Sequence, residues 1–431
     1  MPPSPSVPST DRSERVQRLT YRDAFATVLT FYAFLHVAVV AGTRMWEWAP
    51  ADPCVRWMIS FCSQIHEHGI FNVWTPYPQG ANVLYYGLFL LARLGPWLDF
   101  LFWVYYKAAI HTIPNVLTLY LIYRIGRVIG DHRSAFMASM FYAFSFSTYF
   151  YGLITNFVYD PLPVLLTVLG LYLLLVRKPM KSAVVLGLGT WVKLFPIFLF
   201  MVGLKFFKGR DRRTFALTFS LMTSLCFLPF LLANPSIFLS TYYWQSGRPP
   251  WETVYSYILA LIDEPFAYDE PYYQDYFMEH TGWLFWGITP NPAILAEPIP
   301  PRPLGWWNIV SLLGFLLMFS RFVPAKINDG SKVIGWGAYL LISFFFWNIG
   351  WSPQYELFVI PLLLFMFERV ERATTIVYPL QGCVALEYAL SKPTVIQAPG
   401  MAAAKIFFGF IRYAIFVYVI VYLLRRRFVD R

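Results

Sequence analysis

Most charged residues lie in breaks between long apolar runs, and this pattern constrains the fold more than any other feature of the sequence. The chain has 431 residues, of which 58% are hydrophobic and only 13% are charged. Soluble domains carry roughly 25% charged residues. Apolar runs of about 18 residues recur, which is long enough for a helix to cross a bilayer. The sequence therefore predicts an all-α integral membrane protein with about 10–12 transmembrane helices.

The breaks differ in charge, and the difference predicts an orientation. The short breaks are basic, as in RIGRVIGDHR, RKPMK, KFFKGRDRR, RFVPAKINDGSK and the terminal RRRFVDR. The long break at 234–303 is instead rich in Asp and Glu, with Arg248 as the cation nearest its start. Cytoplasmic loops are enriched in Lys and Arg. We therefore expect both termini in the cytoplasm and the acidic loop on the outer or lumenal face.

The net charge of +10 does not indicate a nucleic-acid partner. Its cations lie in short loops beside apolar runs, where they orient helices and meet anionic membrane lipids. We expect a disordered basic cytoplasmic N-terminus at 1–19, because its first residues are rich in Pro and Ser. A single multispanning domain would follow at 20–431, with outer loops at about 44–101 and 234–303.

Two features of this domain are unusual. The first outer loop contains amphipathic stretches that we expect to form helices lying along the membrane interface. The short apolar runs at 183–192 and 195–207 predict a broken helical hairpin with its hinge at Lys193-Leu194-Phe195-Pro196. Non-helical backbone at membrane depth is tolerated only where it is buried in protein or lines a cavity. The hinge is therefore a candidate site.

Three carboxylates on the predicted outer side are candidates for a general base. Asp52 precedes Pro53, so it is either a base beside the bilayer or a helix cap followed by a first-position proline. Glu47 lies in the same loop. Asp160 opens an apolar run between Tyr159 and two prolines, and it is likewise either functional or a cap.

Two cations on the same side are candidates for binding an anion. Lys193 lies in an otherwise apolar stretch and needs an anionic partner such as a phosphate, unless its ammonium snorkels to the interface. Arg248 lies four residues from Glu252 and either pairs with it or contacts a phosphate while Glu252 holds it in place. Gln354 and Tyr355 belong to a polar turn, WSPQYE, on the same side.

Several segments between residues 20 and 370 resemble motifs of the multispanning glycosyltransferase-C superfamily, closest to family 87 and the GPI-mannosyltransferase-like membrane mannosyltransferases. Those segments are TPYPQGANVLYYGLFLLARLG, NFVYDPLPVLLTVLGLYLLL, LGLGTWVKLFPIFLF, YYWQSGRPPWETVYSYI and WSPQYE. The first departs from the family's YPP pattern at Gln79, and Pro76 stands where relatives have an acid. The paired acidic signature of some relatives is also absent.

The resemblance implies a catalytic acidic residue in the first outer loop, which falls by position on Asp52, with Glu47 as the other candidate. It also implies a polyprenyl-phosphate-sugar donor and a lipid or glycan acceptor. No residue is assigned to a metal, and a divalent cation, Mg²⁺ or Mn²⁺, stays open as a cofactor. Lys193 and Arg248 would neutralise the leaving phosphate, with Glu252, Gln354 and Tyr355 around the substrate.

Two other functions remain open. A transporter or flippase shares the polytopic topology, the broken helix pair and a buried lysine, but it predicts internal repeats and charges at the midplane of several spans. A ligase or polymerase of lipid-linked glycans would use the same chemistry as a sugar transferase. The sequence does not separate this last function from the first.

Overall fold

The computed structural model of the chain describes residues 9–42, 53–75, 77–150, 159–247, 250, 252–262, 298, 305–367, 370–390 and 400–425. All regular secondary structure within these ranges is helical, which confirms the all-α prediction at this level. Three of the described helices are long and apolar enough to cross a membrane: Leu19–Ala41, Gly209–Ala233 and Ala403–Arg425. Shorter apolar helices occupy several of the other predicted spans.

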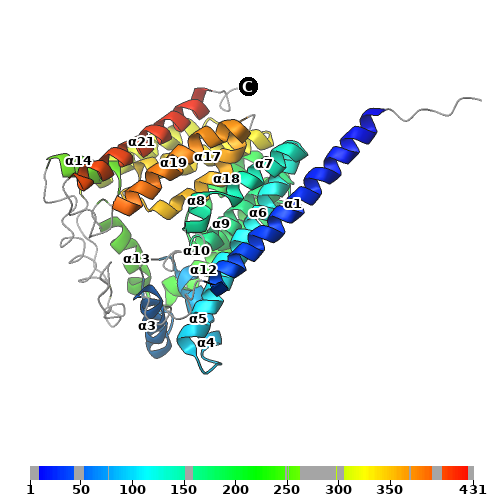
Figure 1. Ribbon diagram of the computed structural model, residues 1–431. Helices are drawn as coiled ribbons and strands as arrows, with labels where there is room; N and C mark the ends of the chain where they lie inside the picture. Colours follow the sequence, from blue (N-terminus) through cyan, green and yellow to red (C-terminus); the bar gives the residue numbers. More distant parts are fainter. Residues whose placement is uncertain are drawn as a thin grey trace, which may run out of the picture.

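The first helix begins earlier than the sequence analysis expected. Helix α1 spans Ser9–Gly42, so the prediction of disorder for 1–19 is wrong from residue 9 onward. The prolines end at Pro8, and the following residues, SERVQRL among them, are mostly good helix formers without glycine or proline. The helix of the first span therefore continues into this stretch. It runs along one side of the molecule and projects beyond it (Figure 1).

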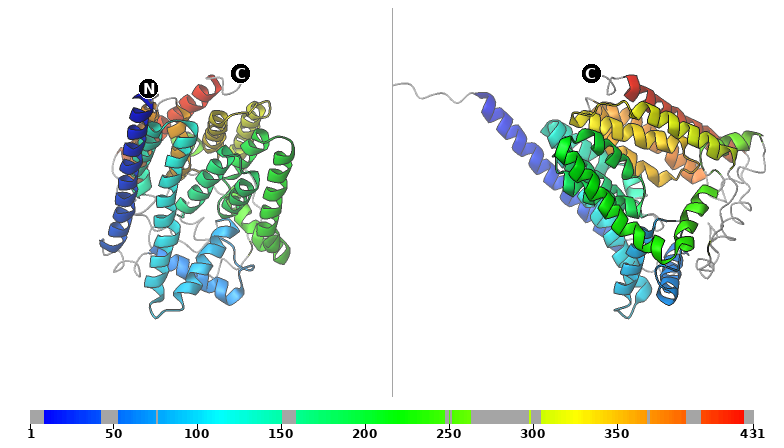
Figure 2. Two further views of the ribbon diagram at one scale, coloured as in Figure 1. Left: turned by 90° about the vertical axis from the view of Figure 1, so that its right-hand side faces the viewer. Right: turned by 180° about the vertical axis from the view of Figure 1, so that it is seen from behind.

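The first predicted outer loop folds into helices at one end of the molecule (Figures 1 and 2). Helix α3 (Pro53–His68) begins at Pro53, as expected for a first-position proline. Helix α4 (Gln79–Ala92) follows a non-helical turn. A Cβ on Gly80 would lie 2.6 Å from the backbone oxygen of Trp191. The glycine thus lets α4 start directly against the end of the helix that precedes Lys193.

A long helical stretch then returns from this end. It consists of α5 (Leu98–Tyr106), a π-helical segment (Lys107–Thr112) and α6 (Ile113–Ile129). Short π-helical insertions frequently mark functional sites. After a basic loop, α7 (His132–Ala143) and the single turn α8 (Phe146–Tyr149) lead back toward the same end.

The next four helices contain the predicted broken hairpin. They are α9 (Pro161–Leu175), α10 (Pro179–Val192), α11 (Ile197–Phe206) and α12 (Gly209–Ala233). Residues 193–196 interrupt the helix between α10 and α11, which confirms the break. Helix α10 packs closely between α9 and α12, because Gly170 and Gly187 leave room for Leu186 and Met222, respectively.

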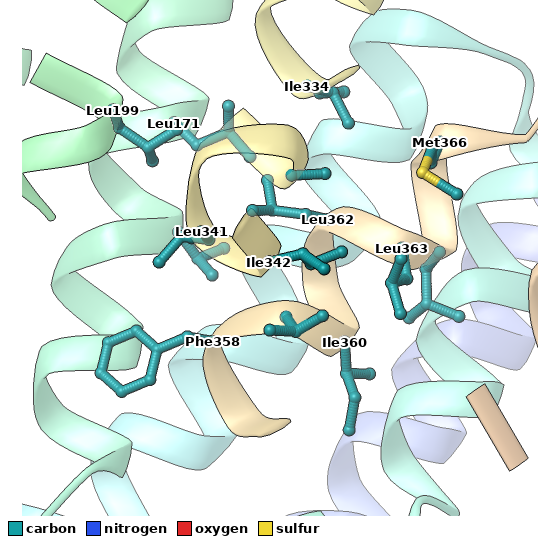
Figure 3. Packing of buried hydrophobic residues seen from close by; sticks show 14 of the residues in the cluster. Leu171, Leu199, Ile334, Leu341, Ile342, Phe358, Ile360, Leu362, Leu363 and Met366 are labelled. Carbon is teal, nitrogen blue, oxygen red and sulfur yellow. The ribbon is translucent and has the colours of Figure 1, made fainter. Parts of the chain in front are cut away.

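The predicted acidic loop begins with α13 (Pro235–Gly247) and α14 (Val254–Ile262). The remaining helices are α16 (Trp306–Phe322), α17 (Gly330–Trp347), the short 3-10 turn η5 (Pro353–Tyr355), α18 (Glu356–Met366), α19 (Val370–Leu390) and α21 (Met401–Arg425). Helices α17 and α18 lie in the centre. Figure 3 shows their side chains, among them Leu341 and Leu362, packed against Leu171 of α9 and Leu199 of α11.

Several helices present apolar faces to the outside. Five leucines of α12 are 44–78% exposed, and α16 and α21 carry similar rows. Soluble monomers rarely expose contiguous apolar surface of this extent, whereas a bundle in hydrocarbon must do so. The leucines of α12 are Leu217, Leu221, Leu225, Leu228 and Leu232.

Candidate functional site

Asp160 and Lys193 form a buried ion pair. Asp160 occupies the position before the first residue of α9, yet its side chain makes no cap hydrogen bond. It instead accepts a hydrogen bond from Nζ of Lys193, the residue after α10. Asp160 is fully buried and Lys193 is 8% exposed. The ammonium therefore does not snorkel to the interface, and the anionic partner it needs is present within the chain.

Four aromatic rings surround the Lys193 ammonium. Its Nζ lies 4.7 Å from the ring centroid of Tyr355 and 4.8 Å from that of Tyr159. The rings of Phe195 and Phe358 lie 5.4 Å and 5.9 Å away. Aromatic faces attract cations at these distances, and the attraction grows when water is excluded. The cage therefore stabilises a charged lysine at the helix break.

The turn that precedes α4 joins this cage. The ring of Tyr77 meets that of Tyr159 edge-on at 5.1 Å, and Tyr85 of α4 meets it at 6.1 Å. Thr75 fixes the turn: its hydroxyl donates to Asn82 at 2.6 Å, and its carbonyl accepts from Thr241 of α13 at 2.8 Å. The segments around Tyr77, Tyr159–Asp160, Lys193 and Tyr355, which are far apart in sequence, thus converge on one ammonium.

Two of the tyrosines near the pair, Tyr159 and Tyr85, stay neutral. Burial, reinforced by neighbouring acidic groups, raises the pKa of Tyr159 well above its ordinary value. Burial likewise raises the pKa of Tyr85. A protonated phenol can donate or accept a hydrogen bond but carries no charge. The ion pair of this cluster is therefore the one between Asp160 and Lys193.

A second buried cluster centres on Arg412 of α21. Its guanidinium donates to both carboxylate oxygens of Glu387 in α19, at 2.8 and 2.9 Å. It also donates to the hydroxyl of Tyr257 at 3.1 Å and to the main-chain carbonyl of Glu252 at 2.8 Å. Lys405, also in α21, pairs with the Glu252 carboxylate at 3.1 Å. Helix α21 thus holds two carboxylates from elsewhere in the chain.

Glu252 has a partner that the sequence analysis did not anticipate. We expected Arg248 to be its partner, but Arg248 lies outside the described residues, and Lys405 of α21 binds the carboxylate. Glu252 adopts a positive φ of 50°. A non-glycine residue in this region is uncommon and stays there only when its surroundings hold it.

Trp351 connects the two clusters. The Arg412 guanidinium lies over its ring at 4.6 Å, and the ring meets Tyr355 edge-on at 5.7 Å. Tyr355 in turn covers Lys193. Gln354 lies beside Tyr355 in η5. Next in the chain, Glu356 accepts a hydrogen bond from Ser147, so α8 contacts the start of α18 beside this turn.

A third group of buried polar residues lies at the π-helical segment. His36 of α1, Lys107 and His111 are all fully buried. The ring of His111 lies 5.1 Å from Tyr106, which lies 5.9 Å from Tyr85. A row of aromatic rings therefore runs from this segment to Tyr159 and the Lys193 cage.

The candidate site and the basic loops lie at opposite ends of α9. Asp160 precedes the helix, whereas Tyr172 in its last turn accepts a hydrogen bond from Arg124 at 2.7 Å. Fifteen helical residues separate these ends by about 22 Å. The exposed Arg133–Glu371 pair, which joins α7 and α19, belongs to the basic end.

The structure brings together some of the residues that the sequence analysis predicted for the site, and separates others. Asp160, Lys193 and Tyr355 meet, with Gln354 adjacent, whereas Glu252 belongs to the Arg412 cluster. Asp52, Glu47 and Arg248 lie outside the described residues. Five further buried residues were not among the predicted site residues: Arg412, Glu387, Lys405, Lys107 and His111. The sequence nevertheless marks them as candidates, because each is an ionisable residue within an apolar run.

The described residues offer no evident metal site. Among them, no three His, Cys, Asp or Glu side chains come together in a way that could hold a metal ion. His66 contacts Tyr86 at 3.1 Å on the outside of α3.

Comparisons with known proteins do not identify a family. No family model matches the chain, and no curated protein or solved structure is found to be similar to it.

Proposed function

We propose that this chain is a membrane glycosyltransferase that transfers mannose or another hexose from a polyprenyl-phosphate donor. The acceptor would be a lipid, a glycan or a protein on the non-cytoplasmic face. The observation that carries the proposal is the buried Asp160–Lys193 pair, because the segments that resemble glycosyltransferase-C motifs supply both its charges and three of its aromatic neighbours, Tyr159, Phe195 and Tyr355.

The chemistry of the pair fits a phosphate leaving group. An ammonium has three N–H donors, and Asp160 occupies one of those on Lys193. A phosphate oxygen would take another while the bond to the sugar breaks. Preorganised positive charge is worth most where water is excluded and charge develops in the transition state.

The proposed reaction is a single displacement with inversion at the sugar. A carboxylate takes the proton from the acceptor hydroxyl, whose oxygen then forms a bond to the anomeric carbon. The bond from that carbon to the phosphate oxygen breaks, and polyprenyl phosphate leaves with the electron pair. Asp52 remains the first candidate for the base, with Glu47 and Asp160 after it, and Arg248 remains a candidate second contact to phosphate.

The proposal includes a multi-pass topology of about 10–12 spans, with both termini in the cytoplasm. It is supported by the apolar outer faces of α12, α16 and α21 and by the separation of the site from the basic loops along α9. In this orientation the Lys193 cage would lie near the outer face, where a lipid-linked donor enters laterally.

Sugar transfer in liposomes tests the proposal. Purified protein would receive radiolabelled polyprenyl-phosphate mannose and a membrane glycolipid extract. We expect transfer by the wild type, and a loss of about 100-fold or more in kcat for Asp52→Asn and for the charge-free double variant Asp160→Asn/Lys193→Met. Asp211→Asn, an exposed carboxylate change at the basic end, is the matched control and should behave as wild type. If the wild type transferred none of several different polyprenyl-phosphate sugars, the result would contradict the proposal.

One observation favours a transporter or flippase as the second candidate. Lys107, Glu387 and Arg412 are ionisable residues of helical, otherwise apolar segments, and all three are fully or almost fully buried. Buried ionisable residues of this kind often line the pathways of transported substrates. The same liposomes would show this function as movement of labelled lipid-linked sugar between leaflets without transfer to an acceptor.

A further inference from the structure

Arg412 contacts three separate parts of the chain. Its partners are Glu387 in α19, the segment from Glu252 to Tyr257, and the ring of Trp351 before η5. The guanidinium is fully buried, so all of these contacts are made without competing water. A fork of N–H donors fixed on two carboxylate oxygens has one orientation, and this orientation places its flat face over Trp351.

The contacts continue from Trp351 to Lys193. The ring of Trp351 meets Tyr355 edge-on at 5.7 Å, and Phe345 packs against both rings at 5.3 Å. Tyr355 then covers the Lys193 ammonium at 4.7 Å. Each ring restricts the next, because tightly packed aromatic side chains cannot turn independently.

We propose that Arg412 is a positioning residue that holds Tyr355 over Lys193 by way of Trp351. None of its hydrogen bonds or ring contacts described above is with Lys193. Through Arg412, the C-terminal helix and the start of the acidic loop control how well water is excluded from the ammonium. The catalytic part of this inference rests on the proposed glycosyltransferase function, but the contact between Tyr355 and Lys193 does not.

Chemical labelling of lysine tests the inference without an activity assay. Protein in detergent micelles or nanodiscs would be treated with a water-soluble acetylating reagent, and the labelling rate of each lysine would be measured by mass spectrometry. We expect Arg412→Met and Arg412→Lys to raise the rate at Lys193 about tenfold by local opening of the cage. Lysine does not rescue, because a single ammonium cannot form the fork.

Two further variants separate the route from general loosening. Trp351→Leu leaves the Arg412–Glu387 pair intact and should raise Lys193 labelling in the same way. Tyr413→Leu removes another ring on Arg412, whose guanidinium carbon lies 4.7 Å from the Tyr413 ring centroid. Among the aromatic pairs of the described residues, Tyr413 does not contact Tyr355. The labelling rate of Lys193 should therefore stay unchanged in this variant. Lys332, equally buried near the start of α17, is the internal control.

Three results would overturn the inference: an unchanged rate at Lys193 in Trp351→Leu, a parallel rise at Lys332, or an equal rise at Lys193 in Tyr413→Leu. In the transfer assay, Arg412→Met should lower kcat with little change in KM, because Lys193 would act on the leaving phosphate. If neither the wild type nor any variant transfers sugar but the labelling rates behave as expected, the proposed function fails and the positioning role of Arg412 stands.

Discussion

Asp160 and Lys193 meet across the open end of an antiparallel helix pair, the carboxylate just before α9 and the ammonium just after α10. The pair therefore joins the two helices where no loop connects them. Removing one partner of a buried pair leaves the other charge uncompensated, which costs far more than the pair contributes net.

This relationship predicts strong coupling between the two residues. Asp160→Asn and Lys193→Met should each lower the free energy of unfolding by about 3–5 kcal/mol, and the double variant by clearly less than the sum. Denaturant unfolding in one detergent would measure all four proteins. A double-mutant cycle on the exposed Arg133–Glu371 pair is the matched control, and there we expect a coupling energy of about 0.2–1 kcal/mol. Additive losses at Asp160 and Lys193 would contradict the pairing.

Gly80 is predicted to be essential for the contact between α4 and α10. A Cβ there would lie 2.6–2.8 Å from backbone atoms of Trp191 and Val192, which cannot move aside as a side-chain end could. We expect Gly80→Ala to destabilise the protein by about 1–3 kcal/mol and to reduce any activity that depends on Lys193.

Gly87 provides the control within the same helix, since a Cβ there meets nothing within 4 Å. Gly87→Ala should stabilise by about 0.5–1 kcal/mol. Equal melting temperatures for the two alanine variants would show that α4 does not press against α10 as described.

The helix break follows closely from the sequence, but the pairing of Asp160 with Lys193 does not, because the sequence analysis gave the Lys193 ammonium a phosphate as its partner. A lysine before Phe-Pro in an apolar run marks the break, and the charge pattern puts Asp160, Lys193 and Tyr355 on one side. The Arg412 cluster does not follow either. Sequence shows that Arg412, Glu387 and Glu252 lie in or beside apolar runs, but not which faces of α19 and α21 turn toward each other. That choice depends on packing between helices distant in sequence.

Asp131 is predicted to make the stability of α7 depend on acid pH. Its side chain accepts from the backbone N–H of Ser134 at 2.7 Å, and this hydrogen bond lowers the pKa of the carboxyl. Because the folded pKa lies below the unfolded one, the stabilisation is complete above the unfolded value of about 3.9 and is lost as pH falls through the folded value. Melting temperatures from pH 6 to pH 3 would show this loss.

Two variants isolate the contribution of Asp131. Asp131→Ala should cost about 1 kcal/mol at pH 6, as for loss of a helix cap. Asp131→Asn keeps an acceptor that does not titrate, so its difference from wild type should change between pH 6 and pH 3. If the stability difference between Asp131→Asn and the wild type stayed constant from pH 6 to pH 3, titration of Asp131 would not be the source of the pH dependence.

Leu221, midway along α12, distinguishes a lipid face from a solvated one. It is 62% exposed. A lysine at the centre of a membrane helix costs about 2.5–3.5 kcal/mol on insertion scales, whereas surface changes in water usually stay within about 0.5 kcal/mol. We expect Leu221→Lys to reduce the membrane-inserted yield and the stability in nanodiscs. Met180→Lys, 57% exposed in the first turn of α10 and close to Arg177, Lys178 and Lys181 in sequence, should have little effect. Equal tolerance of both changes would argue against membrane burial of α12.

The dependence of Glu252 and Glu387 on Lys405 and Arg412 has a consequence for biosynthesis. Both cations belong to α21, which leaves the ribosome after every other described helix. The nascent chain therefore holds two carboxylates beside apolar segments before their counter-charges exist. Packing of α21 against α19 and the segment around Glu252 therefore supplies the counter-charges of both carboxylates late in synthesis.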